Sequence, residues 1–201
     1  MKMRIAVALS GRGSNLEALL DALRPGARAQ VALVMSDRTE AVGLDHARDR
    51  GIPAQVLSQP ADGDEWLRLL WRFQIDLVVL AGYVKLVPAA VIAAYRGRII
   101  NIHPALLPAF GGKGMYGLRV HQAVLASGTP ESGATVHLVD EVYDHGAVLA
   151  QARVPVLPGD TPDTLAERVL AVEHRLLPAA VLAAAIAGRP VPVADPVGSS
   201  S

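Results

Sequence analysis

Residues 76–82, DLVVLAG, form an almost wholly apolar run that starts after a carboxylate and ends at a glycine. A strand with one face in water alternates apolar and polar side chains, because successive side chains point to opposite faces of the sheet. This run does not alternate, which is typical of a strand that is buried on both faces. It therefore predicts a parallel sheet that is covered by helices on both sides.

Strand-like and helical patterns alternate on either side of this run. Short runs rich in valine and isoleucine predict further strands at residues 4–9, 31–35, 54–57, 98–103, 135–139 and 148–156. Apolar residues at helical spacing predict helices at residues 16–23, 41–50, 64–73, 88–95, 120–126 and from 161 onward. Pro178 is expected to kink or interrupt the last helix. The alternation indicates an α/β fold with a mostly parallel, Rossmann-like sheet and helices on both faces, in which ligands bind beyond the carboxyl ends of the strands.

The composition indicates a soluble globular protein without a general affinity for nucleic acid or membranes. The chain has 201 residues, with 19 lysines and arginines and 19 aspartates and glutamates, so its net charge is zero. A neutral chain has no general attraction toward nucleic acid or an anionic membrane surface. The sequence contains no cysteine, which excludes disulfides and thiolate metal sites.

Two apolar segments and the last residues bear on location and domain limits. The N-terminal stretch MKMRIAVAL is too short for a signal peptide, and the run LLPAAVLAAAIAG at residues 176–188 is too short to span a bilayer. A cytoplasmic protein is therefore expected. The ending PVADPVGSSS predicts a disordered tail at residues 189–201, which leaves a single domain at residues 1–188.

A turn that contains two glycines, SGRGSN at residues 10–15, joins the first predicted strand to the first predicted helix. Gly11 and Gly13 allow a tight turn and a close approach of the backbone to a ligand. Ser14 or Asn15 is expected to cap the helix, whose free N–H groups favour an anion. The third glycine of a dinucleotide motif and the lysine of a P-loop are missing, so a small phosphate ester is expected rather than NAD or ATP. The alternative is an ordinary tight turn.

Two polar side chains interrupt another apolar strand, in the segment RIINIHPALLPAF at residues 98–110. Asn101 and His103 are two residues apart, so they point to the same face of the predicted strand near its carboxyl end. The carboxamide can donate a hydrogen bond to a developing oxyanion, and the imidazole can transfer a proton at the same centre. The alternative is a buried structural pair.

A histidine that acts as an acid near neutral pH needs a carboxylate to raise its pKa. The segment VHLVDEVYDHG at residues 136–146 supplies three candidates, Asp140, Glu141 and Asp144, and spacing does not choose among them. Four histidines could also suggest a metal site: His103, His121, His137 and His145. None of them has the spacing of a known metal motif, so no metal is expected.

Five segments together resemble the phosphoribosylglycinamide formyltransferase (glycinamide ribonucleotide transformylase) family: GRGSN, VVLAGY, NIHPALLPAF, SGATVHLVDEVYDHG and GDTPDTLAERVLAVEH. The similarity spans residues 3–188, and NIHPALLP is shared with the wider group of enzymes that use 10-formyltetrahydrofolate. The resemblance implies a formyltransferase-type fold. It also implies transfer of a formyl group from 10-formyltetrahydrofolate, as co-substrate, to the amino group of 5′-phosphoribosylglycinamide in purine (IMP) biosynthesis.

The resemblance further implies a role for each matching residue. Catalysis would fall to Asn101, His103 and Asp144, where Asp144 matches the family aspartate that precedes x-Gly. The ribose phosphate would be held by Gly13, Ser14 and Asn15, and Glu173 would contact the substrate near its reacting end. The folate pocket would be lined by Val84, Lys85, Leu86 and Val87, together with Asn101.

Two segments depart from the family pattern. The stretch QPADGDEW, residues 59–66, is shortened and lacks the arginine that often reaches the folate in this family, so that contact has no assigned residue. The loop FGGKGMYGLRVH, residues 110–121, is longer than usual. Lys113 and Met115 within residues 111–117 are expected to decorate this loop rather than to shape the folate entrance.

Three alternative functions share part of this pattern. A methionyl-tRNA formyltransferase has the same catalytic trio but needs a tRNA-binding domain and positive charge, which this chain lacks. A 10-formyltetrahydrofolate deformylase would hydrolyse the formyl group with a similar catalytic core. A non-catalytic sugar-phosphate or folate-binding module could use the same fold. The oligomeric state stays open, with a homodimer as one expectation.

Overall fold

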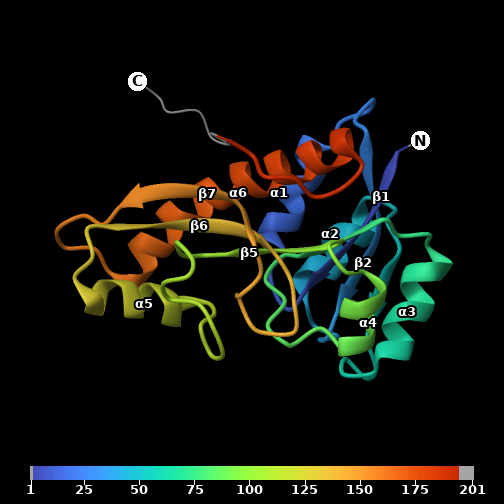
Figure 1. The fold of residues 1–201 in the computed structure, drawn as a ribbon, viewed down its shortest axis with the longest axis horizontal. Coiled ribbons are helices and arrows are strands. Elements are labelled where there is room, and N and C mark those ends of the chain that lie inside the picture. Colours follow the sequence, from blue (N-terminus) through green and yellow to red (C-terminus); the bar gives the residue numbers. More distant parts are fainter. Residues whose placement is uncertain (1, 195–201) are drawn as a thin grey trace.

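The computed structural model describes residues 2–194, which form one seven-stranded sheet with helices on both faces (Figure 1). The strands are β1 (Met3–Leu9), β2 (Ala29–Ser36), β3 (Ala54–Val56), β4 (Leu77–Leu80), β5 (Ile99–His103), β6 (Glu131–Leu138) and β7 (Val148–Pro155). Their order across the sheet is β3-β2-β1-β4-β5-β6-β7. The first five strands pair in parallel, and β6 and β7 extend the sheet in antiparallel. The predicted α/β fold with a mostly parallel sheet is confirmed.

The helices are α1 (Ser14–Ala22), α2 (Val42–Asp49), α3 (Gly63–Arg72), α4 (Ala89–Ala94), α5 (Leu118–Ser127) and α6 (Pro162–Ala187). Every helix and strand predicted from the sequence is present, and most of their ends shift by only one or two residues. The largest shift is in β6, which begins at Glu131 because this residue already pairs with Pro155 of β7.

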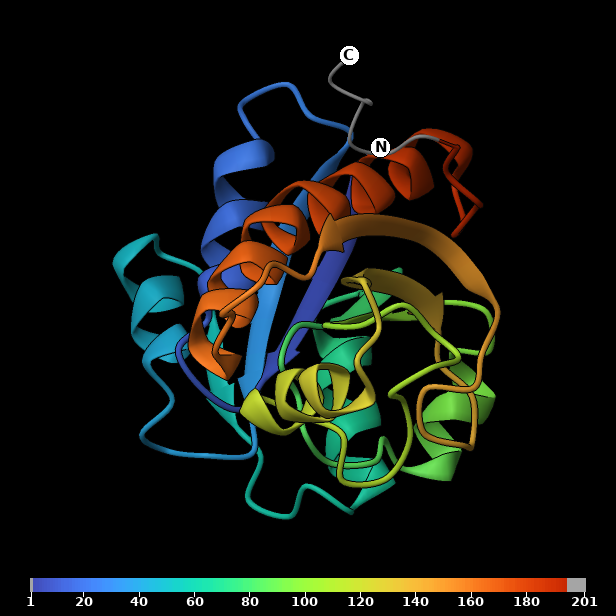
Figure 2. The same ribbon diagram turned by 90° about the vertical axis from the view of Figure 1, so that its left-hand side faces the viewer.

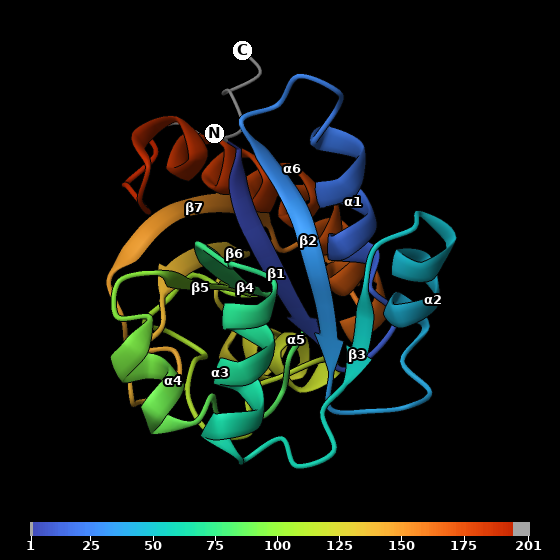
Figure 3. The same ribbon diagram turned by 90° about the vertical axis from the view of Figure 1, so that its right-hand side faces the viewer.

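The central strands are buried on both faces, as the run at residues 76–82 predicts. In β4, Leu77 and Val79 belong to one core cluster, whereas Val78 and Leu80 belong to the other. The first cluster lies under α1, α2 and α6, and the second lies under α3 and α4. Figures 2 and 3 show these two layers of helices on opposite sides of the sheet.

The last helix, α6, begins at a capping box formed by Thr161 and Thr164, with Pro162 in its first turn. It continues through Pro178, so the expected interruption does not occur; Pro178 is buried, and tertiary packing outweighs its missing hydrogen bond. By length and composition α6 could cross a membrane, which residues 176–188 alone do not indicate. Half of its most apolar window is buried inside this fold, however, and α6 contacts β6, β7, α1 and α5. It serves here as a core helix.

The predicted tail, residues 189–201, is described as far as residue 194. Within this part Pro190 is buried, and the Val193 N–H donates a hydrogen bond of 2.8 Å to the Leu149 carbonyl of β7. These contacts place the beginning of the predicted tail against the last strand of the sheet. The remainder of the predicted tail, residues 195–201, lies outside the described residues.

Candidate active site

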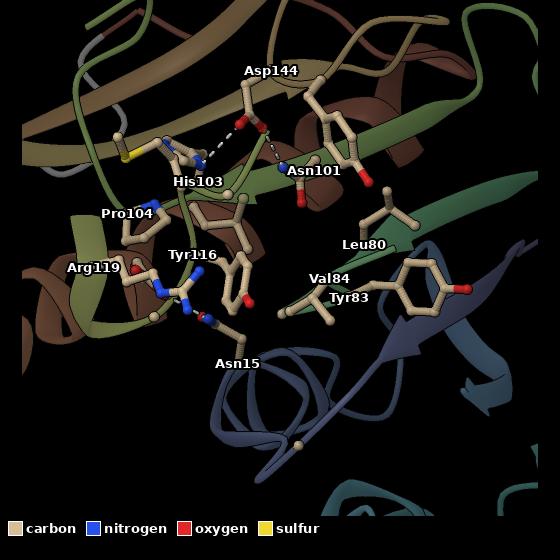
Figure 4. Close-up of a pocket in the computed structure, with 18 of the residues that line it drawn as sticks. Asn15, Leu80, Tyr83, Val84, Asn101, His103, Pro104, Tyr116, Arg119 and Asp144 are labelled. Atoms are coloured by element: carbon tan, nitrogen blue, oxygen red, sulfur yellow. Dashed lines mark hydrogen bonds and ion pairs between the residues drawn. The ribbon is translucent and has the colours of Figure 1, made fainter. Parts of the chain in front are cut away.

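The loops that follow β1, β4 and β5 meet the loop between β6 and β7 around one cavity of about 850 Å³ (Figure 4). Most residues predicted for the site line this cavity: Asn15, Val84, Lys85, Leu86, Val87, Asn101, His103, Asp144 and Glu173. Gly13 and Ser14 are not among the residues that line it. The carboxyl edge of the sheet thus collects residues from almost the whole length of the chain, as expected for an α/β sheet.

The predicted phosphate loop packs closely against the start of α2. A Cβ atom on Gly13 would lie 2.6 Å from the Gly43 Cα, and Gly13 has a φ of 80°, so only glycine fits here without strain. The Gly43 N–H donates a hydrogen bond of 3.1 Å to the Gly11 carbonyl. Gly13 is itself the N-cap and no side chain caps α1, so the capping role expected for Ser14 or Asn15 is wrong. The first-turn N–H groups of α1 stay open to a ligand.

Asn15 and Glu173 come together from α1 and α6. The Asn15 Nδ2 donates a hydrogen bond of 2.6 Å to the Glu173 Oε2, whereas the Asn15 Oδ1 is buried and has no partner among the described residues. Glu173 is 7% exposed. Burial raises the pKa of Glu173 to about 7, and the hydrogen bond from Asn15 only partly opposes this effect. This carboxyl group can therefore exchange a proton near neutral pH.

Asn101 and His103 extend from β5 toward Asp144 on the loop between β6 and β7 (Figure 4). The His103 Nδ1 lies 3.6 Å from the Asp144 Oδ2, and the Asn101 Nδ2 lies 3.4 Å from the Oδ1. The Gly112 N–H donates a further hydrogen bond of 2.9 Å to the Oδ2. Both polar residues of the β5 strand thus reach one carboxylate, in agreement with their predicted shared face.

The structure distinguishes the three carboxylates that spacing alone left open. The Asp140 Oδ2 lies 2.8 Å from the His145 Nδ1 near the surface, and Glu141 accepts a hydrogen bond of 2.6 Å from Arg96. Asp144 is the one of the three that lies against His103. Its backbone has a φ of 54°, a left-handed conformation that glycine, asparagine and aspartate adopt more readily than other residues.

Burial dominates the titration of His103. Burial lowers its pKa, the Asp144 charge and the Phe110 carbonyl raise it, and the net pKa lies below the usual value. The expectation of a raised pKa is therefore wrong for the net shift, although the Asp144 charge acts in the expected direction. Burial would raise the pKa of Asp144, but contact with His137, the His103 charge and the Gly112 amide hold it below its usual value.

His137 completes this cluster, although the sequence suggested it only as a candidate metal ligand. The antiparallel pairing of β5 and β6 places His137 opposite Asn101. Its Nδ1 lies 2.8 Å from the Leu138 carbonyl, so Nδ1 carries the proton and donates. Its Nε2, 3.0 Å from the Asn101 Nδ2, then accepts a hydrogen bond from Asn101. The sequence signal was a histidine inside an apolar strand, but the antiparallel register that gives it this partner is not visible in the spacing.

These contacts fix the orientation of the Asn101 carboxamide. Its Nδ2 faces His137 and Asp144, and its oxygen points into the cavity (Figure 4). In this structure the Asn101 side chain therefore presents a hydrogen-bond acceptor, and not a donor, to the cavity.

The segment at residues 111–117 forms part of the cavity wall. Lys113 and Met115 both line the cavity, so the expectation that they merely decorate a loop is wrong. Gly112 and Gly114, with φ values of 100° and 89°, turn the chain back over the site. The Phe110 carbonyl, just before this segment, lies 2.9 Å from the His103 Nε2. The longer loop therefore contacts the catalytic candidates directly.

Three side chains that the sequence analysis did not single out also line the cavity: Arg12, Tyr116 and Arg119. Arg12 lies within the predicted phosphate loop. The Arg119 guanidinium carbon lies 5.1 Å from the centre of the Tyr116 ring, and Figure 4 shows both residues on the cavity wall. An isolated arginine or tyrosine is a weak sequence signal, so these residues become candidates only once the fold brings their loops together.

The predicted folate wall, residues 84–87, is fastened to the end of β1. The Val84 N–H donates a hydrogen bond of 3.2 Å to the Ser10 hydroxyl, and the Ser10 N–H donates one of 3.0 Å to the Gly82 carbonyl. The Val84 amide is therefore already occupied. Leu86 is 47% exposed and offers an apolar surface to the cavity.

Within residues 2–194, no three histidine, aspartate or glutamate side chains are arranged to hold a metal ion. The Asp144 carboxylate instead lies 3.6 Å from a ring nitrogen of His103 and 3.6 Å from one of His137. The arrangement is suited to proton transfer beside a cavity for an organic ligand.

A family model described as formyl transferase matches residues 3–181. A chloroplastic phosphoribosylglycinamide formyltransferase of Arabidopsis thaliana is 45% identical over 183 residues, covering 87% of this chain and 63% of the plant protein. The phosphoribosylglycinamide formyltransferase of Escherichia coli (strain K12) is 38% identical, covering 88% of this chain and 84% of that protein. This chain thus spans somewhat less than two thirds of the plant relative and most of the bacterial one.

Solved structures give the same picture. The crystal structure of phosphoribosylglycinamide formyltransferase from Anaplasma phagocytophilum superposes with a TM-score of 0.87 at 38% identity, covering 93% of this chain and 88% of the other. Glycinamide ribonucleotide transformylase 1 from Symbiobacterium toebii gives a TM-score of 0.86 at 40% identity and covers 94% of both chains. This chain belongs to the formyl transferase family and, within it, to the phosphoribosylglycinamide formyltransferases.

Proposed function

We propose that this protein transfers the formyl group of 10-formyltetrahydrofolate to the amino group of 5′-phosphoribosylglycinamide, a step of purine (IMP) biosynthesis. The observation that carries the proposal is the contact of Asn101 and His103 with Asp144 in a cavity that the phosphate loop also borders. The cavity, at about 850 Å³, lies within the usual size range of small-molecule sites.

The ribonucleotide would bind at the α1 end of the cavity. Free first-turn N–H groups at Gly13, Ser14 and Asn15 would meet the phosphate through the main chain. Arg12 would add a positive charge to the same loop. Glu173, held by Asn15, would lie near the glycinamide end, where a carboxyl group with a pKa of about 7 can accept a hydrogen bond from the amine.

The folate would bind along residues 84–87. Because the Val84 amide is bonded to Ser10, the main-chain groups of Lys85, Leu86 and Val87 would receive the polar edge of the pterin. Apolar side chains around a few fixed polar groups are the usual composition of such a pocket.

The reaction would begin with attack of the amine on the formyl carbon, which places negative charge on the formyl oxygen. The bond to the folate nitrogen then breaks; that nitrogen takes a proton, and the amine releases one to solvent. His103 would supply the proton from Nε2, which must first leave the Phe110 carbonyl. Asp144 would hold Nδ1 and stabilise the imidazolium.

Asn101 would donate a hydrogen bond to the developing oxyanion. Its Nδ2 would have to release one of its present partners, and the 3.4 Å contact with Asp144 is the weaker of the two. A donor of this kind is worth about 3–4 kcal/mol in the transition state. The 3.0 Å contact with His137 would keep the carboxamide in place during this exchange.

The proposal includes no metal, since proton transfer and an oxyanion donor supply the chemistry. The partners are the two small molecules, without nucleic acid or membrane. We expect a cytoplasmic protein, and a sedimentation measurement would decide between a monomer and a homodimer.

One assay separates this function from its alternatives. The protein is mixed with 10-formyltetrahydrofolate, with and without the ribonucleotide, and the folate absorbance is followed. Loss of the formyl group only in the presence of the amine supports the transferase. Loss in water alone would indicate a deformylase, and no loss would indicate a binding module.

A further inference from the structure

Asp37 is a buried carboxylate that the formyl-transfer proposal does not use. It directly follows β2, and its side chain is only 1% exposed. Among residues 2–194, neither of its carboxylate oxygens accepts a hydrogen bond. Burial of a carboxylate without hydrogen bonds is strongly unfavourable unless a cation compensates it.

That cation is Lys85, which belongs to the proposed folate wall. The Lys85 Nζ lies 3.5 Å from the Asp37 Oδ2, and Lys85 is the salt-bridge partner that Asp37 has within the described part of the chain. The lysine side chain is 53% exposed and lines the cavity, whereas Asp37 does not. The pair therefore connects a buried anchor at the end of β2 to a cation on the cavity wall.

The nearby Tyr83 side chain does not supply a second charge for Asp37. Its hydroxyl is buried and has no hydrogen-bond partner among the described residues. Burial and the Asp37 charge both raise the pKa of Tyr83, so the phenol stays neutral. Tyr83 packs edge-on against Trp66, with ring centres 5.4 Å apart.

Two interactions hold residues 84–87 in place, one through the backbone and one through a side chain. The first joins the Val84 amide to Ser10 at the end of β1 and fixes the backbone. The second joins the Lys85 side chain to Asp37 at the end of β2 and fixes the position of the ammonium group. Loss of the ion pair with Asp37 would leave the backbone of residues 84–87 in place but would no longer fix the position of the Lys85 ammonium group.

We infer that Asp37 is a positioning residue for folate binding, which holds the Lys85 ammonium group where an oxygen acceptor of the folate meets the cavity wall. This inference rests on the proposed function. Lys85 would contact the ligand, and Asp37 would act only through Lys85. The ribonucleotide binds at the other loop and should not sense the change.

The test is the steady-state kinetics of Asp37→Asn, with each substrate varied in turn. Asparagine keeps the size of the side chain and removes its charge. Because charge-assisted contacts contribute about 1.5–3 kcal/mol, the KM for 10-formyltetrahydrofolate should rise about tenfold or more. The KM for the ribonucleotide and the kcat at saturating folate should stay unchanged. Asp21→Asn, which breaks an exposed 3.2 Å pair with Arg50, is the matched control and should change neither KM.

A double variant separates positioning from stability. Lys85→Met leaves the Asp37 carboxylate buried without a counter-ion and should lower the midpoint of thermal unfolding. Adding Asp37→Asn to Lys85→Met should restore that midpoint, while the folate KM stays raised. Recovery of the folate KM together with the midpoint would overturn the inference, as would an equal rise in both KM values for Asp37→Asn. An unmodified protein without formyl transfer would overturn the proposed function and this inference with it.

Discussion

Two buried carboxylates border the same cavity and differ in the partners that surround them. Asp144 lies among His103, His137 and the Gly112 amide, and its pKa is lowered in spite of burial. Glu173 has Asn15 as its hydrogen-bond partner, and burial raises its pKa to about 7. Burial acts in the same direction on both groups but is deeper around Glu173, and Asp144 has more donors and charges nearby, so both factors separate the two pKa values. One end of the cavity thus keeps a fixed charge, while the other can exchange a proton.

The largest effect on activity is expected from a substitution beside Asp144, the carboxylate that stays charged. His103→Ala removes the proposed proton donor, which is also one of the two histidines beside the Asp144 carboxylate. Because general acid catalysis contributes about 10²–10⁴-fold, kcat should fall by that factor. Steady-state assays of formyl transfer measure this loss.

The control for His103→Ala is binding of the ribonucleotide, measured by calorimetry. It should stay close to that of the unmodified protein, because the phosphate loop does not contact His103. A fully active variant would refute the proposed mechanism.

Replacement of Glu173 by glutamine should change how the free energy of unfolding depends on pH. The pKa of Glu173 rises from 4.5 to about 7 on folding, so the folded state binds the proton more tightly than the unfolded state. The resulting stability is fully present below pH 4.5 and is lost as the pH rises through about 7, a total of about 3 kcal/mol. Glu173→Gln carries no such proton and should lack this decline.

Denaturant unfolding of both proteins at several pH values measures this effect. The difference between their unfolding free energies isolates Glu173 from the other titrating groups. If the two stability curves run parallel from pH 4.5 to pH 8, the pKa of Glu173 is not raised and the contrast between the two carboxylates is lost.

A smaller effect is expected from Asn15→Leu, which removes the partner of Glu173. Because Asn15 holds Glu173 near the glycinamide end, its loss should weaken ribonucleotide binding by about 1.5–3 kcal/mol, the size of a charge-assisted hydrogen bond. Folate binding should be unaffected, because residues 84–87 belong to another loop. Calorimetric titration with each ligand tests this separation. Equal losses for both ligands would show that Asn15 does not belong to a separate ribonucleotide end.

Local patterns predicted the elements well. The apolar run at residues 76–82 became β4, with side chains in both core clusters, because burial on both faces leaves a signature in every residue of a strand. An interruption of α6 at Pro178 does not occur, since a local rule cannot include the packing of a buried helix.

Contacts between residues far apart in the sequence were harder to predict. The shared face of Asn101 and His103 follows from strand geometry alone. The choice of Asp144 came from family resemblance, and its contact with His103 depends on a turn between two antiparallel strands. The hydrogen bond between Asn15 and Glu173 joins residues 158 positions apart, and no local pattern encodes it. His137 was missed as a partner of Asn101 for the same reason.

The central claim is that the Asp144 charge opposes the effect of burial on the pKa of His103 and so stabilises its protonated form, the proton donor for formyl transfer. Such an acid is active below its pKa, so the rate falls as the pH rises through that value. Asp144 raises the pKa of His103 against the effect of burial, and removal of its charge must therefore lower it. The direct test is the pH–rate profile of Asp144→Asn. The account predicts that the falling limb moves to lower pH than in the unmodified protein. An unchanged limb, or one that moves to higher pH, would contradict it.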